Sequence, residues 1–149
     1  MGCLTNMKEI YYEQEGWCGP SVLQWVAEQE RLDFTQSRLA EVMGTTNKEG
    51  TSHPQMVEGL KHVGLKGFTL EGLRIEELGI LLKDHHVIVN WMDGEDEEND
   101  GHYSVLKEVR EDKVYLEDKV INIEDFERKW YDIVGGKRVN RWALVVYKK

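Results

Sequence analysis

The two halves of this 149-residue chain carry hydrophobic patterns of different period, and this change restricts the fold more than any other feature. In the first half, apolar residues recur at helical spacing within segments that end at capping or helix-breaking residues. Helices are expected at residues 19–31, 34–44, 52–64 and 75–84, with a short strand at 67–72. The third helix has the clearest boundaries, because Ser52 and Gln55 match a capping box and Gly64 can end it.

The second half is rich in strand-forming residues. Strands are expected at residues 86–92, 102–110, 113–118 and 140–149, with one helix at 123–133. Residues 102–110 and 113–118 are separated by Glu111 and Asp112, which is the length of a tight hairpin turn. Helices followed by mostly antiparallel strands indicate an α+β fold. The length suits one domain over residues 1–149 with a sizeable core.

The charge and hydropathy patterns exclude several classes of partner. The formal net charge is −9, which argues against binding to nucleic acid. Six of the acidic residues fall within residues 93–100, so the acidity is largely local. No apolar segment approaches 18 residues, and the first residues lack the apolar core of a signal peptide. We therefore expect a cytoplasmic protein without a membrane span.

The chain has two cysteines, too few for a disulfide framework. A Cys3–Cys18 bridge is one alternative, but a reducing compartment fits the composition better. Cys18 precedes Gly19 and Pro20, where a helix is expected to begin. A helix N-terminus favours a thiolate, so Cys18 is a candidate nucleophile. The alternative is that Cys18 is a small buried core residue.

A thiolate mechanism also needs a base. The chain offers five histidines: His53, His62, His85, His86 and His102. The first two are expected on an exposed helix. The adjacent pair His85-His86 would point to opposite faces of a strand, so we expect no metal site there. His102 opens a strand beside a loop and is the best-placed candidate.

Asp118 is the candidate for orienting that base. If the hairpin turns at Glu111 and Asp112, His102 pairs with a residue a few positions past Asp118. Strand twist and a bulge could then bring the Asp118 carboxylate to the imidazole. Its alternative role is a solvated turn residue.

Three motifs in this order, QEGWCGPS, GHYSVL and VYLED, resemble those of the bacteriocin-processing family of papain-like cysteine peptidases. Enzymes of that family cut leader peptides after a double glycine. The resemblance runs from about residue 10 to the C-terminus. It implies a papain-like fold with an N-terminal helical half packed against a C-terminal antiparallel sheet. The transporter portion carried by many relatives is absent from this sequence, so we expect a stand-alone relative.

The resemblance also assigns roles to individual residues. It implies that Cys18 is the nucleophile, His102 the general base, Asp118 the orienting acid and Gln14 the oxyanion donor. The family usually places five residues between the glutamine and the cysteine, and here Tyr12 holds that position. The implied function is hydrolysis of a peptide or amide bond through an acyl-enzyme, with no cofactor.

Two other functions are compatible with the same residues. The acyl-enzyme could be used for glutamine deamidation or acyl transfer, since it does not dictate its acceptor. Alternatively, the fold could bind a peptide without turnover. The expected partner in each case is a peptide or protein, and the oligomeric state stays open. The acidic loop at residues 93–100 precedes His102, so it could border the cleft and favour a basic substrate.

Overall fold

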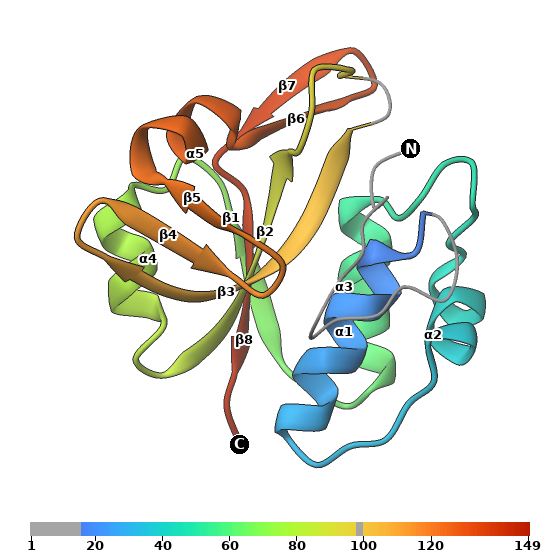
Figure 1. The fold of residues 1–149 in the computed structure, drawn as a ribbon. Coiled ribbons are helices and arrows are strands. Elements are labelled where there is room, and N and C mark those ends of the chain that lie inside the picture. Colours follow the sequence, from blue (N-terminus) through green and yellow to red (C-terminus); the bar gives the residue numbers. More distant parts are fainter. Residues whose placement is uncertain (1–15, 98–99) are drawn as a thin grey trace.

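A computed structural model describes residues 16–97 and 100–149. Three helices form one part of the molecule, and a twisted antiparallel sheet forms the other (Figure 1). The helices are α1 (Cys18–Gln29), α2 (Gln36–Met43) and α3 (His53–His62). The sheet contains β1 (Gly67–Leu70), β2 (His85–Met92), β3 (Gly101–Arg110), β4 (Lys113–Leu116), β5 (Val120–Asn122) and β8 (Ala143–Tyr147). This arrangement confirms the expected α+β fold.

The six strands are ordered β1-β8-β2-β3-β4-β5, and every adjacent pair is antiparallel. The central strand β2 is buried along its last six residues, as expected for a continuous apolar run covered on both faces. Alternate side chains of β2 therefore belong to two separate cores. Ile88 packs with α1 and α3, whereas Val87, Val89 and Trp91 pack on the opposite face.

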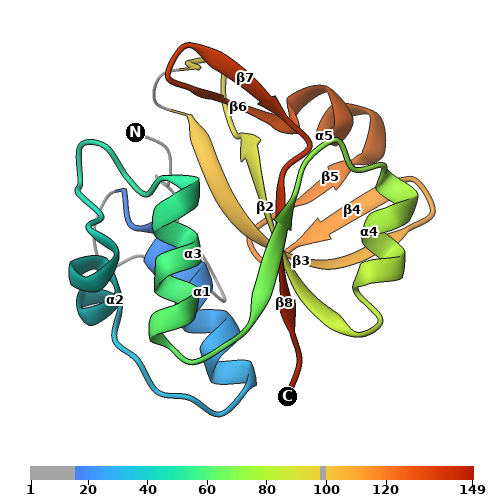
Figure 2. The same cartoon turned by 180° about the vertical axis from the view of Figure 1, so that it is seen from behind.

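Two further helices, α4 (Ile75–Leu81) and α5 (Ile123–Lys129), cover that opposite face (Figures 1 and 2). Leu78 of α4 and Phe126 of α5 are fully buried in the second core. The helix boundaries follow local signals. Ser52 and Gln55 form the expected capping box at the start of α3.

The chain after α5 differs from the expectation of one helix over residues 123–133. The helix ends at Lys129, and Tyr131–Val134 forms β6, which pairs with β7 (Lys137–Asn140). Gly135 and Gly136 form the turn with φ of 57° and 78°, values that glycine adopts without steric cost. The hairpin forms in place of a longer helix because the Gly-Gly pair readily adopts the two consecutive positive φ angles that its turn needs. β5 was also missing from the sequence expectation.

No helix within the described residues is long and apolar enough to span a membrane.

Candidate active site

Cys18 is the first residue of α1, a 12-residue helix whose N-cap is Trp17. Backbone N–H groups of a first helical turn have no partner within the helix and carry partial positive charge. The Tyr103 backbone N–H donates to the Cys18 Sγ over 3.5 Å, which fixes the sulfur beside β3. Cys18 is only 3% exposed, yet it lines a cleft. The structure thus places the sulfur at the base of an opening between the helices and the sheet.

The structure differs from the expectation of a reduced cysteine, because Cys18 is disulfide-bonded. Cys3, the other cysteine of the chain, lies outside the described residues. Nucleophilic chemistry at Cys18 requires the reduced sulfur, since the thiolate is the attacking species.

His102 and Asp118 are in direct contact. His102 Nε2 lies 2.6 Å from Asp118 Oδ2, and both side chains are almost completely buried. The carboxylate thus engages the imidazole through Nε2 and not through Nδ1. His102 precedes Tyr103, the residue that contacts Cys18 Sγ. The start of β3 therefore carries both the residue that pairs with Asp118 and, next to it, the residue that contacts the Cys18 sulfur.

The approach of Asp118 depends on the β3–β4 hairpin. Arg110 pairs with Lys113, so the turn is Glu111-Asp112, as predicted. The register then shifts between Leu106 and Glu108, which marks a bulge. After β4 the chain turns back, with the Leu116 N–H donating to the Lys119 carbonyl over 2.8 Å. Bulge and turn together present the Asp118 carboxylate to the imidazole.

Asp118 has a second buried partner, which sequence reasoning missed. The Ser104 hydroxyl donates to Asp118 Oδ1 over 2.9 Å, and Trp91 Nε1–H donates to Ser104 Oγ over 3.0 Å. Ser104 and Trp91 are both almost completely buried. The period of two along a strand could have revealed this contact, since His102 and Ser104 share one face of β3.

These contacts set the charge state of Asp118. Burial by itself raises the pKa of the carboxyl, but the hydrogen bond and charge of His102, together with the Ser104 hydroxyl, outweigh it and lower the pKa below 3.8. Asp118 is therefore ionised at neutral pH, as a group that orients an imidazole should be.

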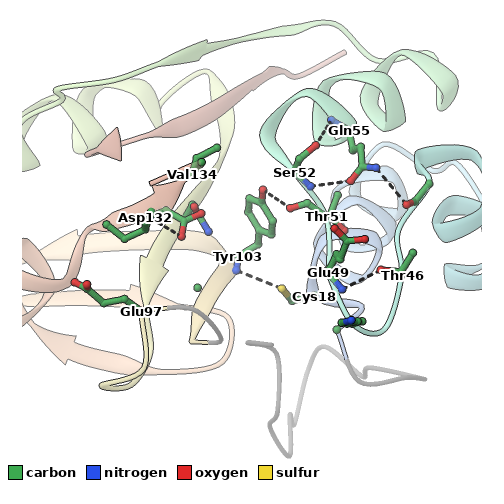
Figure 3. Close-up of a pocket in the computed structure, with 18 of the residues that line it drawn as sticks. Cys18, Thr46, Glu49, Thr51, Ser52, Gln55, Glu97, Tyr103, Asp132 and Val134 are labelled. Carbon is green, nitrogen blue, oxygen red and sulfur yellow. Dashed lines mark hydrogen bonds between the residues drawn. The ribbon is translucent and has the colours of Figure 1, made fainter. Parts of the chain in front are cut away.

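Tyr103 joins the two parts of the molecule at the floor of the cleft. Its hydroxyl donates to the Thr51 carbonyl over 2.9 Å, while its backbone N–H contacts Cys18 Sγ (Figure 3). Desolvation raises the pKa of its phenol well above 10.0, so Tyr103 stays a neutral donor. Sequence reasoning missed this residue too.

The cleft has a volume of about 950 Å³. One wall consists of the loop from Gly44 to Ser52 and the start of α3 (Figure 3). The other wall contains Glu97, Gly101 and the β6–β7 hairpin. The acidic loop therefore borders the cleft through Glu97, whose Oε2 accepts from the Tyr131 hydroxyl over 2.5 Å. A groove of this volume can hold several residues of an extended peptide.

His53 is not the exposed helical residue that the sequence predicted. Its ring stacks on Trp142 with centroids 4.1 Å apart, and only 14% of its side chain is exposed. Asn90 Nδ2 donates to the His102 carbonyl over 3.1 Å, so Asn90 Oδ1 is the acceptor for His53 Nε2 at 2.9 Å. The difference arises from tertiary packing. His53, the first residue of α3, faces the sheet, where it stacks on Trp142 and hydrogen-bonds with Asn90.

Gln14, the predicted oxyanion donor, lies outside the described residues. Trp17, beside the cysteine, is half-buried at the helix start and is not among the residues that line the cleft. Among residues 16–97 and 100–149 no group of three His, Cys, Asp or Glu side chains could hold a metal ion.

Comparison with known protein families adds an independent observation. Residues 6–134 match the model of the Peptidase C39 family. The chain belongs to the Peptidase C39 family. This membership confirms the sequence resemblance and makes the chain a cysteine-type peptidase. No curated protein matches the chain.

Solved structures of C39 domains share its fold. The peptidase domain of Streptococcus ComA, a bi-functional ABC transporter, superposes with a TM-score of 0.73 at 21% identity, covering 97% of this chain and 100% of that one. A putative C39-like peptidase from Bacillus anthracis gives 0.72 at 17% identity, covering 98% and 96%. A double glycine motif protease from an AMS/PCAT transporter, solved with its leader peptide, gives 0.71 at 18% identity, covering 97% and 93%. The papain-like fold is thereby confirmed.

Proposed function

We propose that this C39 peptidase hydrolyses a peptide bond through Cys18, His102 and Asp118. One observation carries the proposal. His102, which bonds the Asp118 carboxylate, directly precedes Tyr103, whose backbone N–H contacts the Cys18 sulfur. A nucleophile, a base and a group that orients the base are the parts that a thiol hydrolase needs.

In the proposed reaction, His102 takes the proton of the Cys18 thiol, and the thiolate attacks the carbonyl carbon of the substrate. The tetrahedral intermediate collapses as His102 gives the proton to the leaving amine, which leaves an acyl-enzyme. His102 then takes a proton from water, the hydroxide attacks the thioester, and the free carboxyl product and the thiol are released. Asp118 fixes the ring through Nε2 and stabilises the imidazolium that forms in each half-reaction.

The oxyanion of the tetrahedral intermediate needs hydrogen-bond donors that are already in position before the reaction starts. The Cys18 backbone N–H, in the first turn of α1, is one proposed donor, and the Gln14 amide is the other. Because the mechanism requires a thiol, we place the activity in a reducing, cytoplasmic setting.

The substrate that we propose is a peptide bound in extended form along the cleft. The double glycine motif protease of similar fold was solved with a leader peptide, which supports a peptide ligand by analogy. Cleavage after a double glycine is the first specificity to test.

The test is turnover of a synthetic peptide library by the reduced protein, with products mapped by mass spectrometry. We expect new termini from hydrolysis, and their loss in Cys18→Ala and His102→Ala. His62→Ala is the matched control, because His62 is exposed on α3. A gain of about 1 Da at glutamine without chain cleavage would instead indicate deamidation. Cleavage that persists in Cys18→Ala would contradict the proposal.

A further inference from the structure

Asp132 projects from β6 into the cleft that contains Cys18 (Figure 3). It lies against the strand that carries the proposed base, because a Cβ atom at Gly101 would be only 2.9 Å from Asp132 Oδ1. Gly101 is one residue before His102 and two before Tyr103. The carboxylate is thus about 6.6 Å along the strand from the residue that contacts the sulfur.

The two carboxylate oxygens of Asp132 have different surroundings. Oδ1 accepts from the backbone N–H of Ile133 over 2.8 Å. Oδ2 lies 3.8 Å from His53 Nε2, which is beyond hydrogen-bond distance, and that nitrogen is already engaged by Asn90. Within the described part of the chain, Oδ2 therefore has an electrostatic neighbour but no hydrogen-bond donor. With 21% of the side chain exposed, it can accept a donor from a molecule in the cleft.

The charges along the cleft are mostly acidic. Among the described residues, the charged side chains that line it are Lys48, Glu49, Glu97 and Asp132. Glu97 accepts from the Tyr131 hydroxyl through Oε2, whereas Asp132 borders the start of β3 and presents Oδ2 to a ligand.

We infer that Asp132 forms a subsite for a lysine or arginine side chain within about two residues of the bond that Cys18 attacks. The inference rests on the proposed function, since it defines the substrate of the same cleft. A cationic side chain supplies both the donor that Oδ2 lacks and a charge that complements the cleft. The carboxylate would hold the substrate in register before the sulfur attacks.

Two charged thiol reagents of similar size test the subsite without a known substrate. One is 2-(trimethylammonium)ethyl methanethiosulfonate, and the other is its 2-sulfonatoethyl analogue. In both reactions the thiolate attacks the sulfenyl sulfur, forms a mixed disulfide and expels methanesulfinate. In a Cys3→Ser background, Cys18 is the only thiol of the chain. Because both reagents react with the same thiolate, its intrinsic reactivity cancels in the ratio of the two rates. The ratio therefore reports the electrostatic potential near the sulfur.

We expect Asp132→Asn to lower the cation-to-anion rate ratio about fivefold at an ionic strength of about 0.01 M. Glu76→Gln is the matched control, because Glu76 is exposed on α4, on the opposite side of the sheet, and should leave the ratio unchanged. An equal ratio in the wild type and in Asp132→Asn would overturn the inference.

The peptide library gives a second measurement. Peptides cut by the wild type should be enriched in lysine or arginine within two residues of the cut, and Asp132→Asn should lose that enrichment. Enrichment that survives the substitution would overturn the subsite. Absence of any cleavage would contradict the proposed function itself, and the reagent ratio would still decide whether Asp132 selects cations.

Discussion

His102 Nε2 and Asp118 Oδ2 lie 2.6 Å apart, although sixteen positions separate the two residues in the chain. The contact is buried, and Oδ1, the second carboxylate oxygen of Asp118, accepts a hydrogen bond from Ser104. A buried carboxylate is stable only when its oxygens are satisfied, so the imidazole and the hydroxyl together keep it ionised and oriented.

Ser104→Ala should lower kcat about tenfold with little change in KM, because a lost hydrogen bond to a buried carboxylate loosens the group that orients His102. Ser104→Thr, which keeps the hydroxyl, should restore most of the rate. Removing the hydroxyl also destabilises the ionised carboxylate, so the acidic limb of the pH–rate profile should move to higher pH. An unchanged pH–rate profile, or a Ser104→Thr variant with a kcat as low as that of Ser104→Ala, would show that Ser104 contributes only to packing.

The lowered pKa of Asp118 makes its contribution to stability dependent on pH. A carboxyl whose pKa is lower in the folded state stabilises that state above the unfolded value, about 3.8, and this effect disappears as the pH falls through the folded pKa. The difference in urea-unfolding free energy between wild type and Asp118→Asn should therefore be constant from pH 5 to 7 and shrink below about pH 4. A difference that does not vary with pH would contradict the assignment. Glu76→Gln serves as an exposed-carboxylate control.

Tyr103→Phe should cost about 1 kcal/mol of unfolding free energy, because it deletes the hydrogen bond that links the sheet to the Thr51 carbonyl. Tyr115→Phe loses only an exposed hydrogen bond to Arg110 and should change stability by less than about 0.5 kcal/mol. Urea denaturation of both variants measures the difference. Equal effects would mean that the link across the cleft floor adds nothing.

Gly19→Ala tests the packing behind Cys18, the proposed nucleophile. A Cβ atom at residue 19 would lie 2.5 Å from Thr51 Oγ1 and 2.7 Å from Thr51 Cβ, so α1 or the loop must move. We expect the free energy of unfolding to fall by about 1–3 kcal/mol and the alkylation of Cys18 to become slower. Gly79→Ala, a helical site with nothing within 4 Å, should instead stabilise by about 0.5–1 kcal/mol. If Gly19→Ala leaves the free energy of unfolding unchanged, the loop that contains Thr51 can move aside without a cost in stability.

The sequence predicted most elements because their signals are local. The capping box at Ser52 and the two-residue turn at Glu111-Asp112 both appear where expected. The β6–β7 hairpin was missed, since the apolar spacing of residues 123–133 continues past the end of α5 and only the Gly-Gly turn signals a reversal. The misplaced His53 has another cause, because its burial depends on Trp142 and Asn90, which are far away in the sequence.

The site follows the same division. Cys18 and His102 were predicted from motifs and from their positions at the ends of elements. Ser104 and Asp132 were not predicted. The period of two places Ser104 on the face of His102, but its contact with Asp118 also depends on the bulge in β3, and the position of Asp132 depends on the β6–β7 hairpin. Periodicity gives the face of a strand, whereas the register between distant strands is set by tertiary packing.

The most direct test of the account is the rate at which iodoacetamide alkylates Cys18 at pH 6. In reduced Cys3→Ser protein, a thiolate stabilised by the α1 N-terminus and His102 should react about tenfold or more faster than a free thiol with a pKa of about 8.5, even after allowing for its lower intrinsic nucleophilicity. His102→Ala should bring the rate close to that of the free thiol, and His62→Ala should not. A Cys18 that reacts no faster than a free thiol, or one that is indifferent to His102→Ala, would contradict the thiolate mechanism.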